Sequence, residues 1–167
     1  TRTSDEIIEV LNGLGSEVFE HTDAFWMDAG WYSYNEGWYD GVGNWTVDTS
    51  RYDNGIIELS DYAKKKGLTN VCINTNATLM KPEYAEMLLD SGVDYISIDC
   101  DGFSKEVYES IRVNADRDVF YKNVEYLLEY KKKINSDTVI DVKIIEMEQN
   151  KHEVEKVVEY WRNRGAW

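Results

Sequence analysis

The 167-residue sequence is poor in cysteine, histidine and positive charge. Its two cysteines, Cys72 and Cys100, fall on different expected buried strands, so we expect inert core thiols rather than a disulfide or a metal pair. A net charge of −14 disfavours nucleic acid and anionic membranes as partners, because both are bound through Lys and Arg. No apolar stretch approaches the roughly 20 residues of a membrane span, and no signal peptide is visible. We therefore expect a cytoplasmic protein.

Helical and strand patterns alternate along the sequence. The spacing Thr3-x-x-Glu6 predicts a capping box that opens the first helix, and Asn150-x-x-Glu153 predicts one that opens the last. Strands separated by helices pair in parallel through right-handed crossovers. The expected strands are 25–28, 71–74, 95–99 and 139–145, and the helices between them include 56–66, 82–90 and two that begin at Ser104 and Asp118.

The expected strands have one apolar and one polar face. Ile96 and Ile98 point to one side, whereas Ser97 and Asp99 point to the other. A doubly wound sheet would be apolar on both faces, so this pattern favours a curved sheet whose polar side lines a cleft. Four βα units make about half of an eightfold barrel. We therefore predict one α/β domain over 1–167, a partial TIM-type (β/α) barrel of about four parallel strands. Asp141 and Lys143, two apart on the polar face, are expected to form an ion pair.

Residues 1–67 include a long Trp-, Tyr- and Gly-rich loop, 29–54. The runs Phe25-Trp-Met-Asp-Ala-Gly-Trp31, Asn35-Glu-Gly-Trp-Tyr and Gly43-Asn-Trp45 resemble bacterial α-galactosidases of glycoside hydrolase family 36. The resemblance implies that Asp28 binds sugar hydroxyls and that Trp26, Trp31 and Trp45 line the pocket. The pair of carboxyls about 5–5.5 Å apart that retaining glycosidases use has no match here. The alternative is a surface loop that packs on itself.

Residues 68–167 resemble the middle and C-terminal part of a radical SAM enzyme core. Ile73-Asn-Thr-Asn-Ala-Thr-Leu79 corresponds to the family's TNG-x-L strand end. Asp90-Ser-Gly-Val-Asp94 with Ile96-Ser-Ile-Asp-Cys-Asp-Gly102 is similar to its SGVD and ISLDG stretch, and Tyr108-Glu-Ser-Ile-Arg112 to its Y-x-x-IR. The resemblance implies that S-adenosylmethionine is held at the strand ends, by Asn76, Ser97, Asp99 and Arg112. The alternative is a polar barrel interior without a ligand.

The cluster-binding CxxxCxxC loop of that family has no counterpart in the sequence. A four-iron cluster is held by thiolates, and two separated cysteines do not supply that loop, so we expect no iron–sulfur cluster and no metal site. The leading hypothesis is a chimeric or designed partial-barrel scaffold without autonomous catalysis that binds S-adenosylmethionine weakly. The alternatives are a galactoside-binding remnant and half of an enzyme completed by a partner chain.

A homodimer is the predicted assembly. A partial barrel leaves two sheet edges open, and two copies would bury edges that are otherwise prone to aggregation. Light scattering on the purified chain checks this expectation. A monodisperse monomer at tens of micromolar would contradict it.

Overall fold

The computed structural model describes residues 3–22, 31–41, 46–55, 57–68 and 70–167. The chain divides into two compact units, Thr1–Val71 and Cys72–Trp167. Both the strand expected at 25–28 and part of the aromatic loop lie outside the described residues.

The first unit contains α1 (Ser4–Gly13), α2 (Ser16–Glu20), the 3-10 helix η1 (Trp38–Gly41) and α3 (Ile57–Lys65). The predicted capping box at the start of α1 is confirmed. The Glu6 N–H donates to Thr3 Oγ1 at 3.3 Å, and the Thr3 N–H donates to the Glu6 carboxylate at 2.9 Å. Helix α1 contacts α3, and Leu11 and Leu59 are buried on these two helices.

The described parts of 29–54 pair with each other. Ser33 N–H donates to the Thr46 carbonyl at 2.8 Å and Asp48 N–H to the Trp31 carbonyl at 3.0 Å, around an antiparallel bridge between Tyr32 and Val47. The carbonyl of the following Arg51 accepts from the N–H of Ser4 at 3.0 Å, which fastens this hairpin-like segment to the start of α1.

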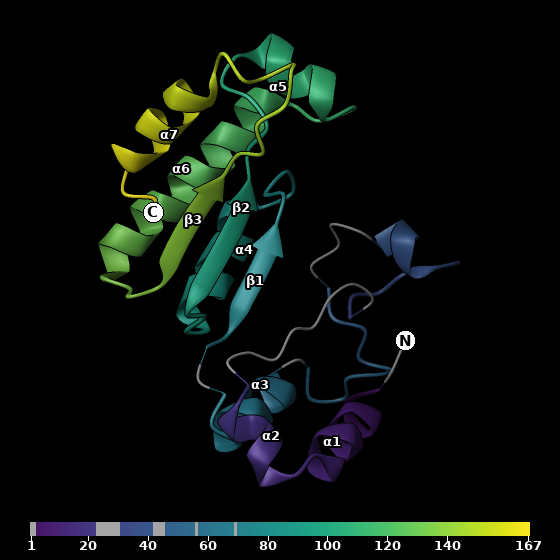
Figure 1. Cartoon of the computed structure of the whole chain (residues 1–167). Helices are drawn as coiled ribbons and strands as arrows, with labels where there is room; N and C mark the ends of the chain where they lie inside the picture. The colour runs from purple at the N-terminus through teal and green to yellow at the C-terminus, as the bar shows by residue number, and fades with distance from the viewer. Residues whose placement is uncertain (1–2, 23–30, 42–45, 56, 69) are drawn as a thin grey trace. The chain divides into compact units, whose positions relative to one another are not determined.

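The second unit is a three-stranded parallel sheet in the order β1-β2-β3 (Figure 1). The strands are β1 (Cys72–Thr75), β2 (Tyr95–Asp99) and β3 (Val139–Lys143). Four helices alternate with and follow them: α4 (Pro82–Asp90), α5 (Lys105–Ile111), α6 (Arg117–Ile134) and α7 (Val154–Arg162). The predicted α/β class and parallel pairing are confirmed. A fourth strand and a half-barrel remain predictions.

The apolar face of the sheet forms the core of this unit. Ile96 and Ile98 are 0% exposed and Ile140 is 1% exposed. Helices α4 and α6 lie on one side of the sheet in Figure 1 and contact each other, and α6 contributes the buried side chains Phe120 and Leu127. Burying one such side chain contributes about 1.5–3 kcal/mol. The strand alternation seen in the sequence therefore correctly identifies the buried face.

The loop that follows β2, residues 100–104, is called the β2–α5 loop here. Its backbone is hydrogen-bonded by side chains from two other places in the chain, the turn 150–153 and α6. The Asp101 carbonyl accepts from Asn150 Nδ2 at 3.0 Å, and the Gly102 carbonyl accepts from the Tyr121 hydroxyl at 3.0 Å. A carboxylate oxygen of Glu153 accepts from the N–H groups of Phe103 at 2.8 Å and Ser104 at 3.1 Å.

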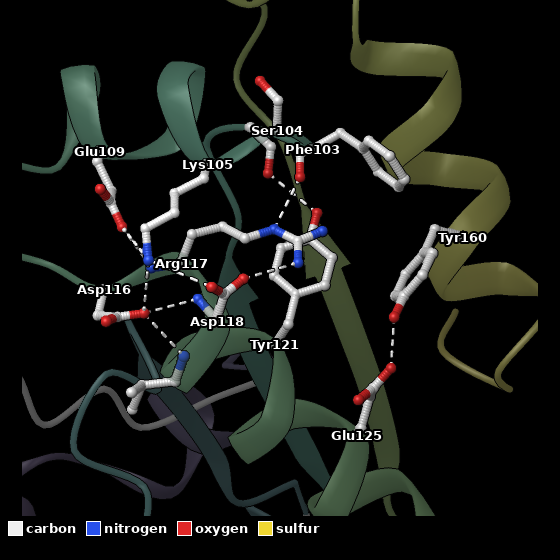
Figure 2. A network of polar contacts seen from close by, with 12 residues as sticks. Phe103, Ser104, Lys105, Glu109, Asp116, Arg117, Asp118, Tyr121, Glu125 and Tyr160 are labelled. Atoms are coloured by element: carbon white, nitrogen blue, oxygen red, sulfur yellow. Dashed lines mark hydrogen bonds and ion pairs between the residues drawn. The ribbon is translucent and has the colours of Figure 1, made fainter.

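Arg117, the first residue of α6, completes this arrangement (Figure 2). Its Nε donates to the Phe103 carbonyl at 2.8 Å, and its guanidinium carbon lies 3.4 Å from the centroid of the Tyr121 ring. A cation over an aromatic face is stabilising where water is excluded.

The capping box predicted at the start of α7 is wrong. Glu153 occupies the N-cap position of α7, but none of the side chains that the structure describes caps that helix. The side chains of Asn150 and Glu153 instead bind the β2–α5 loop. Helix α6 also begins earlier than predicted, because Asp116 rather than Asp118 caps it, accepting from the N–H groups of Asp118 and Val119.

We predict that Gly102→Ala destabilises the protein. A Cβ at position 102 would lie 2.7 Å from the backbone nitrogen of Tyr108 and 3.0 Å from its Cα. Overpacking of this kind costs about 1–3 kcal/mol. Thermal unfolding followed by circular dichroism measures the effect. Gly13→Ala is the control, because a Cβ there meets nothing within 4 Å. Equal unfolding temperatures for Gly102→Ala and the unsubstituted chain would contradict the packing argument.

We also predict that Glu153 makes stability depend on pH. Burial raises the pKa of this carboxyl, but interaction with the Ser104 side chain, together with the hydrogen bonds from the N–H groups of Ser104 and Phe103, outweighs burial and holds the pKa below its ordinary value. A lowered pKa stabilises the fold above the ordinary value of roughly 4.3, and this contribution is lost as the pH falls through the folded pKa.

Replacement of Glu153 by Gln is expected to cost about 1–3 kcal/mol at neutral pH. The difference in the free energy of unfolding between Glu153→Gln and the unsubstituted chain should become smaller as the pH is lowered. Urea unfolding at a series of pH values measures it, with the exposed α6 residue Glu129 changed to Gln as the control. A difference that does not change with pH would refute the assigned role of the charge.

Candidate functional site

One face of the sheet in the second unit is lined by polar side chains. The register places Asn74, Ser97 and Asp141 in one row across the three strands and Asp99 beside Lys143 in a row nearer the strand ends. Helices α4 and α6 pack behind the sheet, against the other face (Figure 1). We call this face the polar face; it comprises Cys72, Asn74, Tyr95, Ser97, Asp99, Asp141 and Lys143.

A cluster of four charges lies at the carboxyl ends of β2 and β3. Arg112, the C-cap residue of α5, pairs through Nε with a carboxylate oxygen of Asp101. Its Nη2 lies 3.8 Å from Asp99 Oδ2, and Lys143 Nζ lies 3.9 Å from Asp99 Oδ1. Both distances to Asp99 exceed the roughly 3.2 Å of a good hydrogen bond. Asp99, whose side chain is 47% exposed, therefore has acceptor oxygens available for a ligand.

The sequence motifs predict Asp99 and Arg112 at this site, but they do not predict Asp101 or Lys143. Asp101 lies in the same motif as Asp99, and its 11% exposed side chain forms the closer ion pair with Arg112. The Lys143–Asp99 contact depends on the register of β3 against β2, which the sequence pattern does not specify. The ion pair predicted between Lys143 and Asp141 is wrong, because each side chain has a different partner.

Ser97 lies in the middle of β2 rather than at its end. It is two residues before Asp99, a displacement of about 6.6 Å along a strand. Its side chain is buried, and in the described part of the chain its Oγ has no hydrogen-bond partner. A buried hydroxyl without a partner carries a free-energy cost of about 1–3 kcal/mol. A ligand group beside Ser97 would remove that cost.

Asn76 lies one residue beyond the pair formed by Thr75 and Ile98, level with Asp99. Its Oδ1 accepts from Thr78 N–H at 3.2 Å and from Thr78 Oγ1 at 2.8 Å, so this oxygen holds the turn rather than a ligand. The next residue, Ala77, stands where the TNG motif has glycine and has a φ of 51°. Asn123 of α6 donates to the carbonyls of Ala77 and Thr78 at 2.9 and 3.3 Å.

Tyr95 and Asp141 form a second polar pair, one pleat further from the strand ends. The Tyr95 hydroxyl donates to Asp141 Oδ2 at 2.7 Å. Burial, followed by this hydrogen bond to a carboxylate, raises the pKa of Tyr95 to about 12. The phenol therefore stays protonated at neutral pH and serves as a hydrogen-bond donor.

The residues predicted to bind sugar are mostly not placed. Trp26, Asp28 and Trp45 lie outside the described residues. Trp31 is described, and its ring meets Tyr32 edge-on with centroids 5.4 Å apart. The sugar-binding prediction therefore stays untested.

The described residues do not fit an iron–sulfur cluster. Among them no group of three or more His, Cys, Asp or Glu side chains is arranged to hold a metal ion. Cys100 is buried, with its Sγ 3.6 Å from the Gly102 carbonyl and 3.8 Å from the Tyr121 hydroxyl. Cys72 is exposed, so its predicted place in the core is wrong. Within the described ranges, no helix is both long enough and apolar enough to cross a membrane.

The chain is similar to a curated protein and, weakly, to solved structures. The chain is 24% identical over 111 residues to a probable GTP 3',8-cyclase of Methanococcus maripaludis, and the match covers 66% of this chain. It spans only 35% of that relative. The crystal structure of 2,3-dimethylmalate lyase, a PEP mutase/isocitrate lyase superfamily member, covers 99% of this chain at 14% identity, and 60% of the lyase is covered. Its TM-score of 0.48 is too low to carry an argument.

The sequence profile of the radical SAM superfamily matches residues 35–161, about three quarters of the chain. The match covers all three strands of the described sheet and the charge cluster at their ends. It also begins well before residue 68, inside the segment that resembles an α-galactosidase. The chain belongs to the radical SAM superfamily.

Proposed function

We propose that residues 72–167 bind S-adenosylmethionine at the carboxyl ends of β1, β2 and β3. The observation that carries this proposal is the half-exposed carboxylate of Asp99 between two cations that do not saturate it. Parallel sheets bind ligands beyond their carboxyl strand ends.

The chemistry of the ligand matches the groups present. S-adenosylmethionine has a ribose diol that a carboxylate such as Asp99 can accept from, and an amino-acid carboxylate that Arg112 or Lys143 can pair with. Arginine is suited to carboxylates because its planar fork can donate two parallel hydrogen bonds. The unpartnered Ser97 hydroxyl supplies a further donor on the same face. These residues fit the ligand in charge and in hydrogen-bonding capacity.

The same residues do not supply the whole of a radical reaction. Bound S-adenosylmethionine supplies radical chemistry to an enzyme when an iron–sulfur cluster delivers the electron. The 167 residues contain two cysteines, fewer than the three thiolates of a CxxxCxxC loop. We infer that this chain contributes ligand binding, and that a complete enzyme would need a cluster loop from outside these residues. Asp99, Arg112 and Lys143 would then orient the ligand.

The origin of residues 1–67 stays a hypothesis. The galactosidase resemblance rests on residues largely outside the described ranges. The radical SAM match overlaps its second half, from residue 35 onward. A chimeric or designed chain with a residual galactoside site is therefore the competing proposal. It is tested by titrating galactose alongside S-adenosylmethionine.

Calorimetric titration with S-adenosylmethionine tests the proposal. Saturable binding is expected, and Asp99→Asn or Arg112→Ala should weaken it about tenfold or more, because hydrogen bonds to charged groups contribute about 1.5–3 kcal/mol. Glu129→Gln, on the outer surface of α6, should bind like the unsubstituted chain. Absence of binding by the folded protein would refute the proposal. Galactose binding that is lost in Asp28→Ala would assign the function to residues 1–67.

A further inference from the structure

Asn150 bridges the loops that follow β2 and β3. It is 0% exposed, and its Nδ2 donates both to the Asp101 carbonyl at 3.0 Å and to the Ile145 carbonyl at 2.9 Å. Its Oδ1 accepts from the Met147 N–H at 2.7 Å. One planar amide therefore sets the spacing between the carboxyl ends of two neighbouring strands.

Glu153 holds the next part of the same loop. Its carboxylate is buried, and one oxygen accepts from the N–H groups of Phe103 and Ser104. The Glu153 N–H donates to the Asn150 carbonyl at 2.8 Å, so the two residues lie in one turn. We call this pair the Asn150–Glu153 clamp.

The clamp is connected to Arg112 by two routes. The first runs through Asp101, whose carbonyl is bound by Asn150 and whose carboxylate pairs with Arg112. The second runs through α5, because Glu153 binds the N–H of Ser104, the N-cap residue of the helix whose C-cap is Arg112.

The side chains of the clamp do not cap α7, the helix that follows them. An N-cap side chain usually binds the free N–H groups of its own helix, yet none of the described side chains caps α7. Burying a carboxylate is costly unless it is fully hydrogen-bonded. Here that buried charge is directed at the β2–α5 loop. Residues that do not touch a ligand can in this way hold a ligand-binding side chain in position, through hydrogen bonds to its neighbours.

We propose that Asn150 and Glu153 are positioning residues that fix the Asp101–Arg112 ion pair, and through it the ligand site. The ion-pair part of this inference stands on the described contacts alone. The ligand part rests on the proposed function, in which Arg112 binds S-adenosylmethionine.

The ion-pair part is tested by nuclear magnetic resonance of the full chain without ligand. The Arg112 Nε–H resonance reports the pairing with Asp101. It should shift in Glu153→Gln and in Asn150→Ser. Leu89→Ala, which removes part of a buried side chain on α4, should lower the unfolding temperature without moving the resonance. An unmoved Arg112 resonance in Glu153→Gln would overturn the proposal.

The ligand part is tested by a double-mutant cycle on the affinity for S-adenosylmethionine. Glu153→Gln should weaken binding by about fivefold in the unsubstituted chain, and it should have little further effect in Arg112→Ala, because coupled residues are not additive. Glu153→Asp keeps the charge on a shorter side chain. Its affinity for S-adenosylmethionine should lie between those of the unsubstituted chain and Glu153→Gln. Equal losses in both backgrounds would mean a purely structural role and would overturn the ligand part. If the unsubstituted chain does not bind, the proposed function fails, whereas the resonance still decides whether the clamp holds Arg112.

Discussion

The architecture of residues 72–167 depends on how the backbone of one buried loop is hydrogen-bonded. A loop without regular structure carries N–H and C=O groups that cannot be left unpaired away from water. In the β2–α5 loop these groups are bound by Asn150, Glu153, Tyr121 and Arg117, which come from a later connection and from α6. The conformation of the loop at the end of β2 therefore depends on where α6 and the connection before α7 pack. A change in the position of α6 or of the start of α7 alters the loop that carries Asp101.

Figure 2 shows exposed ion pairs of Lys105 next to the contacts that Arg117 makes with the β2–α5 loop. Lys105 at the start of α5 contacts Glu109, Asp116 and Asp118 at 3.2–3.6 Å, all partly exposed. Exposed ion pairs of this kind contribute roughly 0–1 kcal/mol each. The contacts of Arg117 and Glu153 to the loop backbone matter more, because they are part-buried and pair main-chain groups that have little access to water. The surface pairs orient α5 against α6, while the buried bonds hold the loop.

The fold could be predicted where the signals are local. Pro82 at the start of α4 and Gly92 just beyond its end, with a φ of 74°, mark that helix, and its predicted bounds match the structure. The alternation of Ile and polar residues likewise identifies β2 and its buried face. Local patterns failed where a side chain had a distant partner. The N-x-x-E spacing at 150–153 looks like a helix cap, but burial directs both side chains to a loop about 50 residues away.

The candidate site shows the same division between local and distant signals. Asp99 and Arg112 could be predicted to lie at the strand ends because each is part of a recognisable motif. The neighbours that modify them, Asp101 and Lys143, depend on helix placement and strand register. Ser97 is predicted at the strand end but lies two residues before it, because a sequence motif does not specify the residue at which a strand ends. Distances between side chains, which decide the chemistry, are properties of the packed sheet.

Ala77 limits which sequences this fold can accept. Its φ of 51° lies in a region that non-glycine residues rarely adopt, and the residue is 1% exposed. A larger or β-branched residue would combine backbone strain with crowding in a filled space. Asparagine tolerates the backbone angle but would need a partner for its buried amide. Position 77 is therefore expected to vary almost entirely between alanine and glycine among functional variants, a narrower range than at the exposed positions of the same turn.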